Sequence, residues 1–452
     1  MSWRSSLREP RFLCALVILV ALPAAGETVT LLHFSDYHSH ALPFYSEGRG
    51  GQGGLARGAG FLARHKRNGA LVFSGGDMMN KGAPAWSDKY GCVEWSWLNG
   101  IVDAMAFGNH DADYGWEAWL RCRDSVRYPI LSANIEGFPR YTILDARGKR
   151  IGVFALAGSD FPSLVRLPEL KFTDRIAAAR EVVKRLRDVE RVDAVVLIGH
   201  EHGGDDQALA RAVPGIDVIF GTHGHEKKEL AQIPGTGTWT IAPFQYLAYV
   251  SRVDLIFTGG RLTSVRGSLV PVDARMPLHR AIARNVGRLQ RELEKDPQYR
   301  HLFVPFAALS SPISVNALGR LTVGVMRDAA RADVAVSTRS SFRGALPPGP
   351  IDLETLRAAM PYDNELVVAE MTPATYARLL EIAAAAGESE SGVYSAGAPV
   401  AGSERVTVAT TDYLARVAGG YREVFTASSQ RGTGLRIREL VRERIVAGAR
   451  AP

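Results

Sequence analysis

Short hydrophobic runs alternate with amphipathic segments from residue 28 to about residue 272. Segments with a period near 3.6 predict helices at Leu55–Arg67, Trp116–Arg123 and Thr173–Val189. The hydrophobic runs predict strands at Val29–Phe34, Ala70–Phe73, Ile101–Phe107, Ile151–Ala157, Asp193–Ile198 and Asp217–Phe220. Two further runs, Thr240–Val250 and Ser251–Phe257, predict antiparallel strands. Strands that alternate with helices are typical of an α/β domain.

The pattern changes after residue 277 and then restarts. Leu278–Phe303 is long, charged and amphipathic, and we expect it to form a connecting helix. Beyond it, a helix at Asn316–Arg331 and a strand at Asp333–Val336 begin a second α/β series. Because 452 residues exceed what one hydrophobic core holds, two domains are expected. We place the first at 27–277, a linker helix at 278–305 and the second domain at 306–452.

The N-terminus has the pattern of a secretory signal peptide. Arg4, Arg8 and Arg11 precede the apolar run Phe12–Leu22, and small residues follow at 23–26. The alternative is an uncleaved membrane anchor, but the run is shorter than the ~20 residues of a spanning helix. We therefore predict cleavage after residue 26 and a periplasmic or secreted protein with no stable membrane anchor.

Composition and charge exclude some function classes. The chain is 46% hydrophobic and 22% charged, as in ordinary soluble enzymes. Loss of three arginines and one glutamate with the signal peptide lowers the formal charge from +7 to about +5. The sequence contains no dense Lys/Arg run of the kind that indicates nucleic-acid binding. The mild positive charge is compatible with a small anionic substrate. Cys92 and Cys122 remain, and an oxidising compartment would allow a disulfide, although spacing alone leaves their pairing open.

Side chains that bind metals follow five of the predicted strands. The carboxyl ends of strands meet at one edge of a sheet, so these side chains are expected to gather there. They are too many for one tetrahedral zinc and suit two divalent ions bridged by a carboxylate. Mixed nitrogen and oxygen ligands fit manganese, zinc, iron or cobalt. The candidate ligands are Asp36, His38, Asp77, Asn109, His200, His223 and His225.

The order of these motifs resembles that of the calcineurin-like metallophosphoesterases. They are D-x-H, GGD, GNHD, a single histidine after a strand, and H-x-H. The stretch "WLNGIVDAMAFGNHDADYG" is similar, more narrowly, to the 5'-nucleotidase branch. In the second half, "PYDNELVVAEMT" and "VATTDYLARVAGGY" resemble stretches of that family's C-terminal domain. The resemblance implies a four-layer αββα sandwich followed by a smaller α/β C-terminal substrate-binding domain.

The resemblance also implies roles for the candidate ligands. One ion would be held by Asp36, His38, Asp77 and His225, and the other by Asp77, Asn109, His200 and His223. His110 would face the phosphate to stabilise charge or protonate the leaving oxygen, with Asp113 fixing its tautomer and favouring its cationic form. We interpret Asp111 as a turn residue, and His40 and His202 as surface or supporting residues.

The substrate contacts implied for the second domain are less well matched. Tyr362 and Tyr421 fall at the family's two base-stacking positions, and the alternative is that both rings only pack. Asn364, Arg343 and Arg320 match positions that contact the substrate. However, the family turn NGGGIR reads "TRSSFR" at 338–343, so three glycines that let the backbone approach the substrate are absent. The sequence therefore supports phosphoester hydrolysis more strongly than it supports a preference for nucleotides.

These observations predict a dinuclear-metal phosphoesterase that attacks phosphate esters with a metal-bound hydroxide. Nucleotides or nucleotide-like molecules are the expected substrates, as for a 5'-nucleotidase, UDP-sugar hydrolase or cyclic phosphodiesterase. One alternative is a thiosulfohydrolase of sulfur oxidation, which shares the metal site. The other is a binding protein that retains metal without catalysis.

Overall fold

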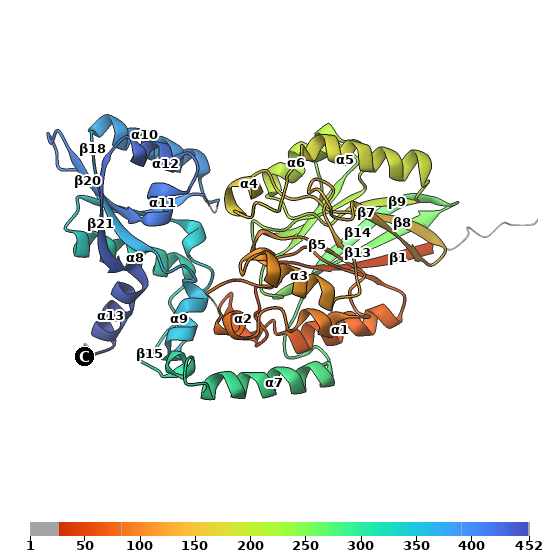
Figure 1. The fold of residues 1–452 in the computed structure, drawn as a ribbon, viewed down its shortest axis with the longest axis horizontal. Helices are drawn as coiled ribbons and strands as arrows, with labels where there is room; N and C mark the ends of the chain where they lie inside the picture. The colour runs from red at the N-terminus through yellow and green to blue at the C-terminus, as the bar shows by residue number, and fades with distance from the viewer. Residues whose placement is uncertain (1–26, 83, 390, 451–452) are drawn as a thin grey trace, which may run out of the picture.

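The computed structural model describes residues 27–82, 84–389 and 391–450. The predicted signal peptide lies outside the described residues. Two α/β domains lie side by side and are joined through the α7 region (Figure 1). Within the described part of the chain, no helix combines the length and apolar character that crossing a membrane requires.

The first domain contains two six-stranded sheets, and the first of these carries the early motifs. Its order is β14-β13-β1-β4-β5-β6. The parallel strands are β1 (Glu27–Phe34), β4 (Leu71–Ser74), β5 (Ala104–Ala106) and β6 (Ile130–Leu131). The antiparallel neighbours are β13 (Tyr249–Thr258) and β14 (Arg261–Pro271), and a small hairpin pairs β2 (Phe44–Ser46) with β3 (Arg49–Gln52).

The second sheet of this domain carries the later histidines. Its order is β11-β12-β10-β9-β8-β7. The parallel strands are β8 (Lys149–Phe154), β9 (Ala194–Leu197), β10 (Val218–Phe220) and β12 (Trp239–Pro243). The antiparallel edges are β7 (Tyr141–Ala146) and β11 (Lys227–Gln232).

The two sheets pack face to face, with helices outside both. Leu31 and Phe73 of the first sheet share a buried cluster with Val196 and Phe220 of the second. The helices whose buried residues pack on the outer faces of the sheets are α1 (Leu55–Arg67), α3 (Trp116–Ser125), α5 (Arg175–Lys184) and α6 (Gly203–Ala212). The π-helical turn η3 (Arg185–Val189) extends α5. The expected four-layer αββα sandwich is therefore confirmed.

The linker helix is shorter than predicted and belongs to the packing of the first domain. It comprises α7 (Arg280–Lys295) and the short turn η4 (Arg300–Phe303). The buried residues of α7 recur at helical spacing and pack in the core cluster that includes Leu55 and Ala59 of α1. These residues are Ile282, Val286, Leu289 and Leu293.

The second domain is built on a five-stranded sheet with the order β19-β16-β20-β18-β21. Its strands are β16 (Val334–Thr338), β18 (Glu365–Met371), β19 (Val393–Gly397), β20 (Val406–Thr411) and β21 (Ser429–Arg436), and β15 (Ala307–Leu309) pairs separately with β17 (Gly349–Ile351). Its helices are α8 (Val315–Ala330), η5 (Arg339–Ser341), α9 (Leu353–Ala359), α10 (Pro373–Ala386), α11 (Asp412–Arg416), α12 (Tyr421–Thr426) and α13 (Ile437–Arg450).

Short elements of the first domain complete its structure, and α2 contacts the second domain. These elements are α2 (Ala85–Tyr90), η1 (Trp95–Leu98), η2 (Asn109–Ala112) and α4 (Phe161–Leu164). The backbone N–H of Ala85 in α2 donates to Glu354 of α9 at 2.7 Å. Arg357 of α9 pairs with Asp88 of α2 at 3.1 Å. These polar contacts join the domains where α2 and α9 lie side by side (Figure 1).

One strand prediction was wrong. Instead of one strand at Thr240–Val250, β12 ends at Pro243 and β13 begins at Tyr249 in the other sheet. Phe244, Tyr246 and Leu247 between them have positive φ angles, and the Tyr246 N–H donates to the Asp36 carbonyl at 2.7 Å. The hydrophobic pattern does not show this turn because the side chains of residues 245–248 remain buried while the backbone changes sheet.

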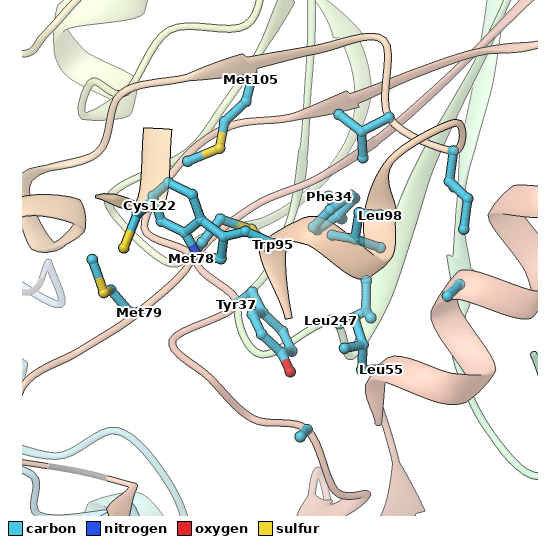
Figure 2. Packing of buried hydrophobic residues seen from close by; sticks show 14 of the residues in the cluster. Phe34, Tyr37, Leu55, Met78, Met79, Trp95, Leu98, Met105, Cys122 and Leu247 are labelled. Carbon is cyan, nitrogen blue, oxygen red and sulfur yellow. The ribbon is translucent and has the colours of Figure 1, made fainter. Parts of the chain in front are cut away.

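The structure settles the pairing of Cys92 and Cys122, which form a disulfide with their Cα atoms 5.7 Å apart. The bond joins the segment before η1 to α3. Cys122 lies in the same buried cluster as Trp95 and Tyr37, part of which Figure 2 shows.

A carboxyl group is buried in this region. Glu94 is 1% exposed, and its Oε1 accepts a hydrogen bond from the Tyr37 hydroxyl at 3.3 Å. Burial raises the pKa of the Glu94 carboxyl to about 8. Its pKa in the unfolded chain is lower, about 4.3. The carboxyl is therefore protonated in the folded protein at neutral pH, and its contribution to stability is lost as the pH rises from the unfolded pKa to the folded one.

We expect Glu94→Gln to remove this pH dependence. The variant should gain, relative to the wild type, up to about 1.4 kcal/mol of unfolding free energy per pH unit between pH 5 and pH 8. Urea unfolding at several pH values measures the difference, and Glu169→Gln at an exposed position is the control. A difference between Glu94→Gln and wild type that stays constant with pH would contradict the prediction.

Candidate active site

The loops after β1 and β10 bring the first group of candidate ligands together. Asp36, His38 and His225 are buried, and each offers one ligand atom within 4.8 Å of the others. The Nε2 atom of His225 lies 3.4 Å from Asp36 Oδ1 and 3.2 Å from His38 Nε2. Two imidazoles and a carboxylate therefore face one point between the two sheets.

A second group of candidate ligands lies beside the first, and the Asp77 carboxylate lies close to both groups. Asp77 after β4, His200 after β9 and His223 after β10 also offer ligand atoms within 4.8 Å of one another. Asp77 Oδ2 lies 3.2 Å from His200 Nε2 and 3.7 Å from His38 Nε2. The Asp77 carboxylate thus stands between the two groups, as a bridging ligand requires.

Polar atoms that lack hydrogen bonds indicate what these groups bind. Asn109 Oδ1 is buried without a hydrogen-bond partner, and the closest polar neighbours of Asp36 Oδ1 and His200 Nε2 are other candidate ligands. A buried polar atom left unpaired costs about 1–3 kcal/mol. A divalent cation would satisfy Asn109 Oδ1 and the ligand atoms crowded beside it, and nitrogen and oxygen donors together suit manganese, zinc, iron or cobalt. The residues present therefore fit a divalent-metal site.

The backbone at this site is strained. Asp36, His38, Asp77, His223 and His225 have φ between 48° and 58°, a region that costs a residue other than glycine about 1–3 kcal/mol. Neighbouring loops hold these conformations. The Asp36 N–H donates to the Gly76 carbonyl at 3.1 Å, and the His38 N–H donates to the Asp77 carbonyl at 2.9 Å. The loop that carries Asp36 and His38 is therefore held by the loop that carries Asp77.

Both central carboxylates are held in their ionised form. Burial alone would raise the pKa of Asp77, but the histidines beside it, His200 foremost, hold the pKa well below its usual range. Asp36 behaves in the same way, with His225 lowering its pKa against the effect of burial. An ionised carboxylate is the form that binds a cation.

His110 stands at the edge of the ligand groups and is paired with a carboxylate. Its Nδ1 lies 2.8 Å from Asp113 Oδ2, and its backbone N–H donates to Asp77 Oδ1 at 2.8 Å. Burial would lower the pKa of His110, but Asp113 and Asp77 raise it to about 10. Because Asp113 accepts the Nδ1 proton, Nε2 is the atom left to exchange a proton with a substrate.

Asp111 does more than complete a turn, which is the role predicted for it. It is fully buried and accepts hydrogen bonds from the backbone N–H groups of Asp77, Met78 and Gly108 at 3.1, 2.7 and 2.8 Å. It thereby ties the GGD loop to the GNHD loop. Gly108 permits this contact, because a Cβ there would lie 2.2 Å from the Asp77 nitrogen.

Asp160 is a functional candidate that the sequence analysis missed. Its Oδ2 lies 2.9 Å from His223 Nε2 and 3.3 Å from His202 Nε2. A carboxylate only accepts, so His223 carries its proton on Nε2 and presents Nδ1 as the ligand atom. One signal was available, because Asp160 follows the one early predicted strand, Ile151–Ala157, to which no ligand had been assigned.

The two accessory histidines lie beside the ligands. His202 contacts Asp160, as described above, and lines the cavity between the domains. His40 Nδ1 lies 2.9 Å from the His38 carbonyl, and its ring stacks on Tyr246 with a centroid distance of 3.5 Å. Both positions agree with a supporting role.

A cavity of about 1140 Å³ opens between the two domains over this site. His110 and Asp113 line it from the first domain, and Arg343, Tyr362 and Asn364 line it from the second. Arg343 donates to the Tyr362 hydroxyl at 2.9 Å and also contacts His225. The second domain therefore places a guanidinium group directly at the candidate ligands.

Two predicted substrate contacts are placed differently. Arg320 is exposed on α8 and lies outside the cavity lining, to which the helix contributes Val315 and Asn316 at its start. Tyr421 borders the cavity but is 2% exposed, and its hydroxyl donates to the Ser391 carbonyl at 2.9 Å. The Tyr421 ring packs in the core of the second domain.

We expect Asp160→Asn to weaken metal binding, because the amide no longer fixes the His223 tautomer. Loss of such a partner typically lowers metal affinity or activity by ~10–100-fold. Competition with a chelator measures the affinity, and Asp145→Asn at an exposed position of β7 is the matched control. Unchanged metal affinity in Asp160→Asn would exclude a positioning role.

Comparison with known proteins agrees with this geometry. The calcineurin-like phosphoesterase family matches residues 29–227, and the 5'-nucleotidase C-terminal domain matches residues 301–398. The protein UshA of Yersinia enterocolitica is 26% identical over 504 residues, covering 92% of this chain and 90% of UshA.

Solved structures share the two-domain fold. A 5'-nucleotidase precursor from Thermus thermophilus has a TM-score of 0.76 at 19% identity, covering 94% of this chain and 97% of its own. The sulfate thiohydrolase SoxB of the same organism has a TM-score of 0.73 at 21% identity, with 95% of each chain covered. At these identities the likeness shows the fold alone. The two matched domains and the aligned relatives show that the chain belongs to the 5'-nucleotidase family and is a metal-dependent phosphoester hydrolase.

Proposed function

We propose that this protein hydrolyses nucleotides or nucleotide-like phosphate esters with two divalent metal ions. The position of Asp77 carries the proposal, because its carboxylate stands between two buried groups of ligands. Asp36, His38, Asp77 and His225 would hold one ion. Asp77, Asn109, His200 and His223 would hold the other.

Two metal ions in such a site polarise the phosphoryl group and activate the attacking water. The chain itself supplies the remaining chemistry. His110, kept protonated by Asp113, stabilises charge on the phosphoryl oxygens or protonates the leaving oxygen. Arg343 reaches the site from the second domain and binds a phosphate oxygen.

The nucleotide preference rests on the second domain and the relatives. Tyr362 lines the cavity and offers a ring for stacking, with Asn364 two residues further along the chain. The 5'-nucleotidase names of several relatives point to the same substrate class. A cavity of about 1140 Å³ has room for a nucleoside monophosphate.

We further propose that the protein acts in the periplasm or outside the cell. The disulfide between Cys92 and Cys122 suits an oxidising compartment. The N-terminal sequence has the charged and apolar segments of a signal peptide.

Phosphate release from nucleoside monophosphates, nucleotide sugars, cyclic nucleotides and an aryl phosphate, with manganese added, tests the activity. Turnover of a nucleotide supports the proposal and excludes a binding protein without catalysis. Hydrolysis of a thiosulfonate on a thiol carrier, with no phosphate released from any ester, would favour the thiosulfohydrolase alternative instead.

We expect Asp77→Asn to lose metal and activity together, because the amide removes the charge shared by both ligand groups. Metal content of the purified variant, measured with kcat, checks this, and Asp145→Asn controls for a general effect of removing a carboxylate. Full metal occupancy together with the wild-type rate would refute the ligand assignment.

We expect His110→Ala to keep its metal, because His110 is not a ligand, and to lose ~10²–10⁴-fold in kcat. Metal analysis and steady-state kinetics on an aryl phosphate separate the two effects. If the variant loses its metal, His110 itself belongs among the ligands.

A further inference from the structure

The cavity between the domains carries a second guanidinium group, Arg339, which contacts Tyr394 and Glu388 of the second domain. Arg339 begins η5, the turn in which family glycines are replaced by Arg339, Ser340 and Ser341. Thr338 and Ser341 satisfy each other through a hydroxyl contact of 2.9 Å. The Arg339 side chain lines the cavity, four residues before Arg343.

The guanidinium group of Arg339 is held in place by an aromatic ring. Its central carbon lies 4.7 Å from the centroid of the Tyr394 ring. That ring is fixed in turn, since its hydroxyl donates to Asn316 at 2.6 Å and Phe342 packs edge-on at 5.4 Å. The cation is therefore positioned before any substrate binds, which lowers the entropy cost of binding.

The present partner of Arg339 is easily displaced. Arg339 pairs with Glu388 through contacts of 3.0 and 3.2 Å, but the Glu388 side chain is 87% exposed. Such solvent-exposed pairs contribute only about 0–1 kcal/mol. A carboxylate or phosphate entering the cavity would form the same bidentate contact, and Glu388 would turn to solvent.

The same residues leave little room for the family's aromatic sandwich around a base. Tyr421 is 2% exposed, and its hydroxyl is bonded to Ser391. The Tyr394 ring is covered by Arg339 on one face. Tyr362 is thus the one of the two expected stacking rings that is accessible in the cavity.

We propose that the second domain selects phosphate esters that carry a carboxylate at the end distant from the bond that is cut. Arg343 serves the scissile phosphate at the metal ligands, and Arg339 binds the distant anion. This inference rests on the proposed phosphoester hydrolysis and concerns only which esters are preferred.

Paired substrates that differ by one carboxylate test the preference. Orotidine and uridine 5'-monophosphate form one pair, and 4-carboxyphenyl and phenyl phosphate form the other. The metal-loaded full chain, Arg339→Gln and Glu388→Gln are compared by kcat and KM. The matched control is Arg378→Gln on α10, because Arg378 also forms an exposed pair with a glutamate, Glu381 at 2.8 Å, and lies outside the cavity lining.

We expect the wild type to favour the carboxylated member of at least one pair. Arg339→Gln should raise KM for that member by ~10–100-fold, the value of a charge-assisted hydrogen bond, and leave KM for the counterpart without a carboxylate unchanged. Glu388→Gln should strengthen the preference several-fold, because Arg339 loses its competitor. Arg378→Gln should behave as the wild type.

The possible outcomes test this substrate preference separately from the proposed phosphoester hydrolysis. Hydrolysis of all four esters with no preference for a carboxylate would overturn the inference and leave the phosphoesterase intact. Equal losses on both members of a pair in Arg339→Gln would show a structural role for Arg339 and also overturn it. No hydrolysis of any ester would overturn the proposed function, and this inference with it.

Discussion

The buried carboxylate of Asp77 is the constraint on which the rest of the site depends. A charge in a protein interior is tolerated only when it is paired and hydrogen-bonded. Asp77 has His200 at 3.2 Å, His38 at 3.7 Å and the His110 N–H at 2.8 Å. These partners come from different strands of both sheets, so satisfying one carboxylate requires the two sheets to end at the same place.

That requirement explains the strained loops around the site. Five ligand residues adopt positive φ, and backbone hydrogen bonds between the loops after β1 and β4 hold Asp36, His38 and Asp77 there. Asp111 adds a buried tie between the GGD and GNHD loops, and Gly108 lets these loops touch. Strain of this kind persists where surrounding structure overdetermines the conformation, which suits a site that must hold its geometry during a reaction.

The candidate metal ligands and the residues expected to select the substrate come from different domains. The first domain carries every candidate ligand, whereas the second contributes Arg343, Tyr362 and Arg339 to the shared cavity. Substitutions in the 338–341 turn therefore change what the cavity can hold without moving a ligand.

The alternation of hydrophobic and polar residues by itself determined the α/β class and the second domain. It also placed D-x-H, GGD, GNHD and H-x-H at strand ends, because the extent of a strand follows from the local pattern. Recognition of the family supplied the four-layer order. Only the tertiary structure decided the rest: the 92–122 disulfide, the sheet-crossing turn at 244–248, the contact of Asp160 with His223, the burial of Tyr421 and the exposure of Arg320. Each of these depends on which loops from distant parts of the chain come into contact, and no local pattern carries that information.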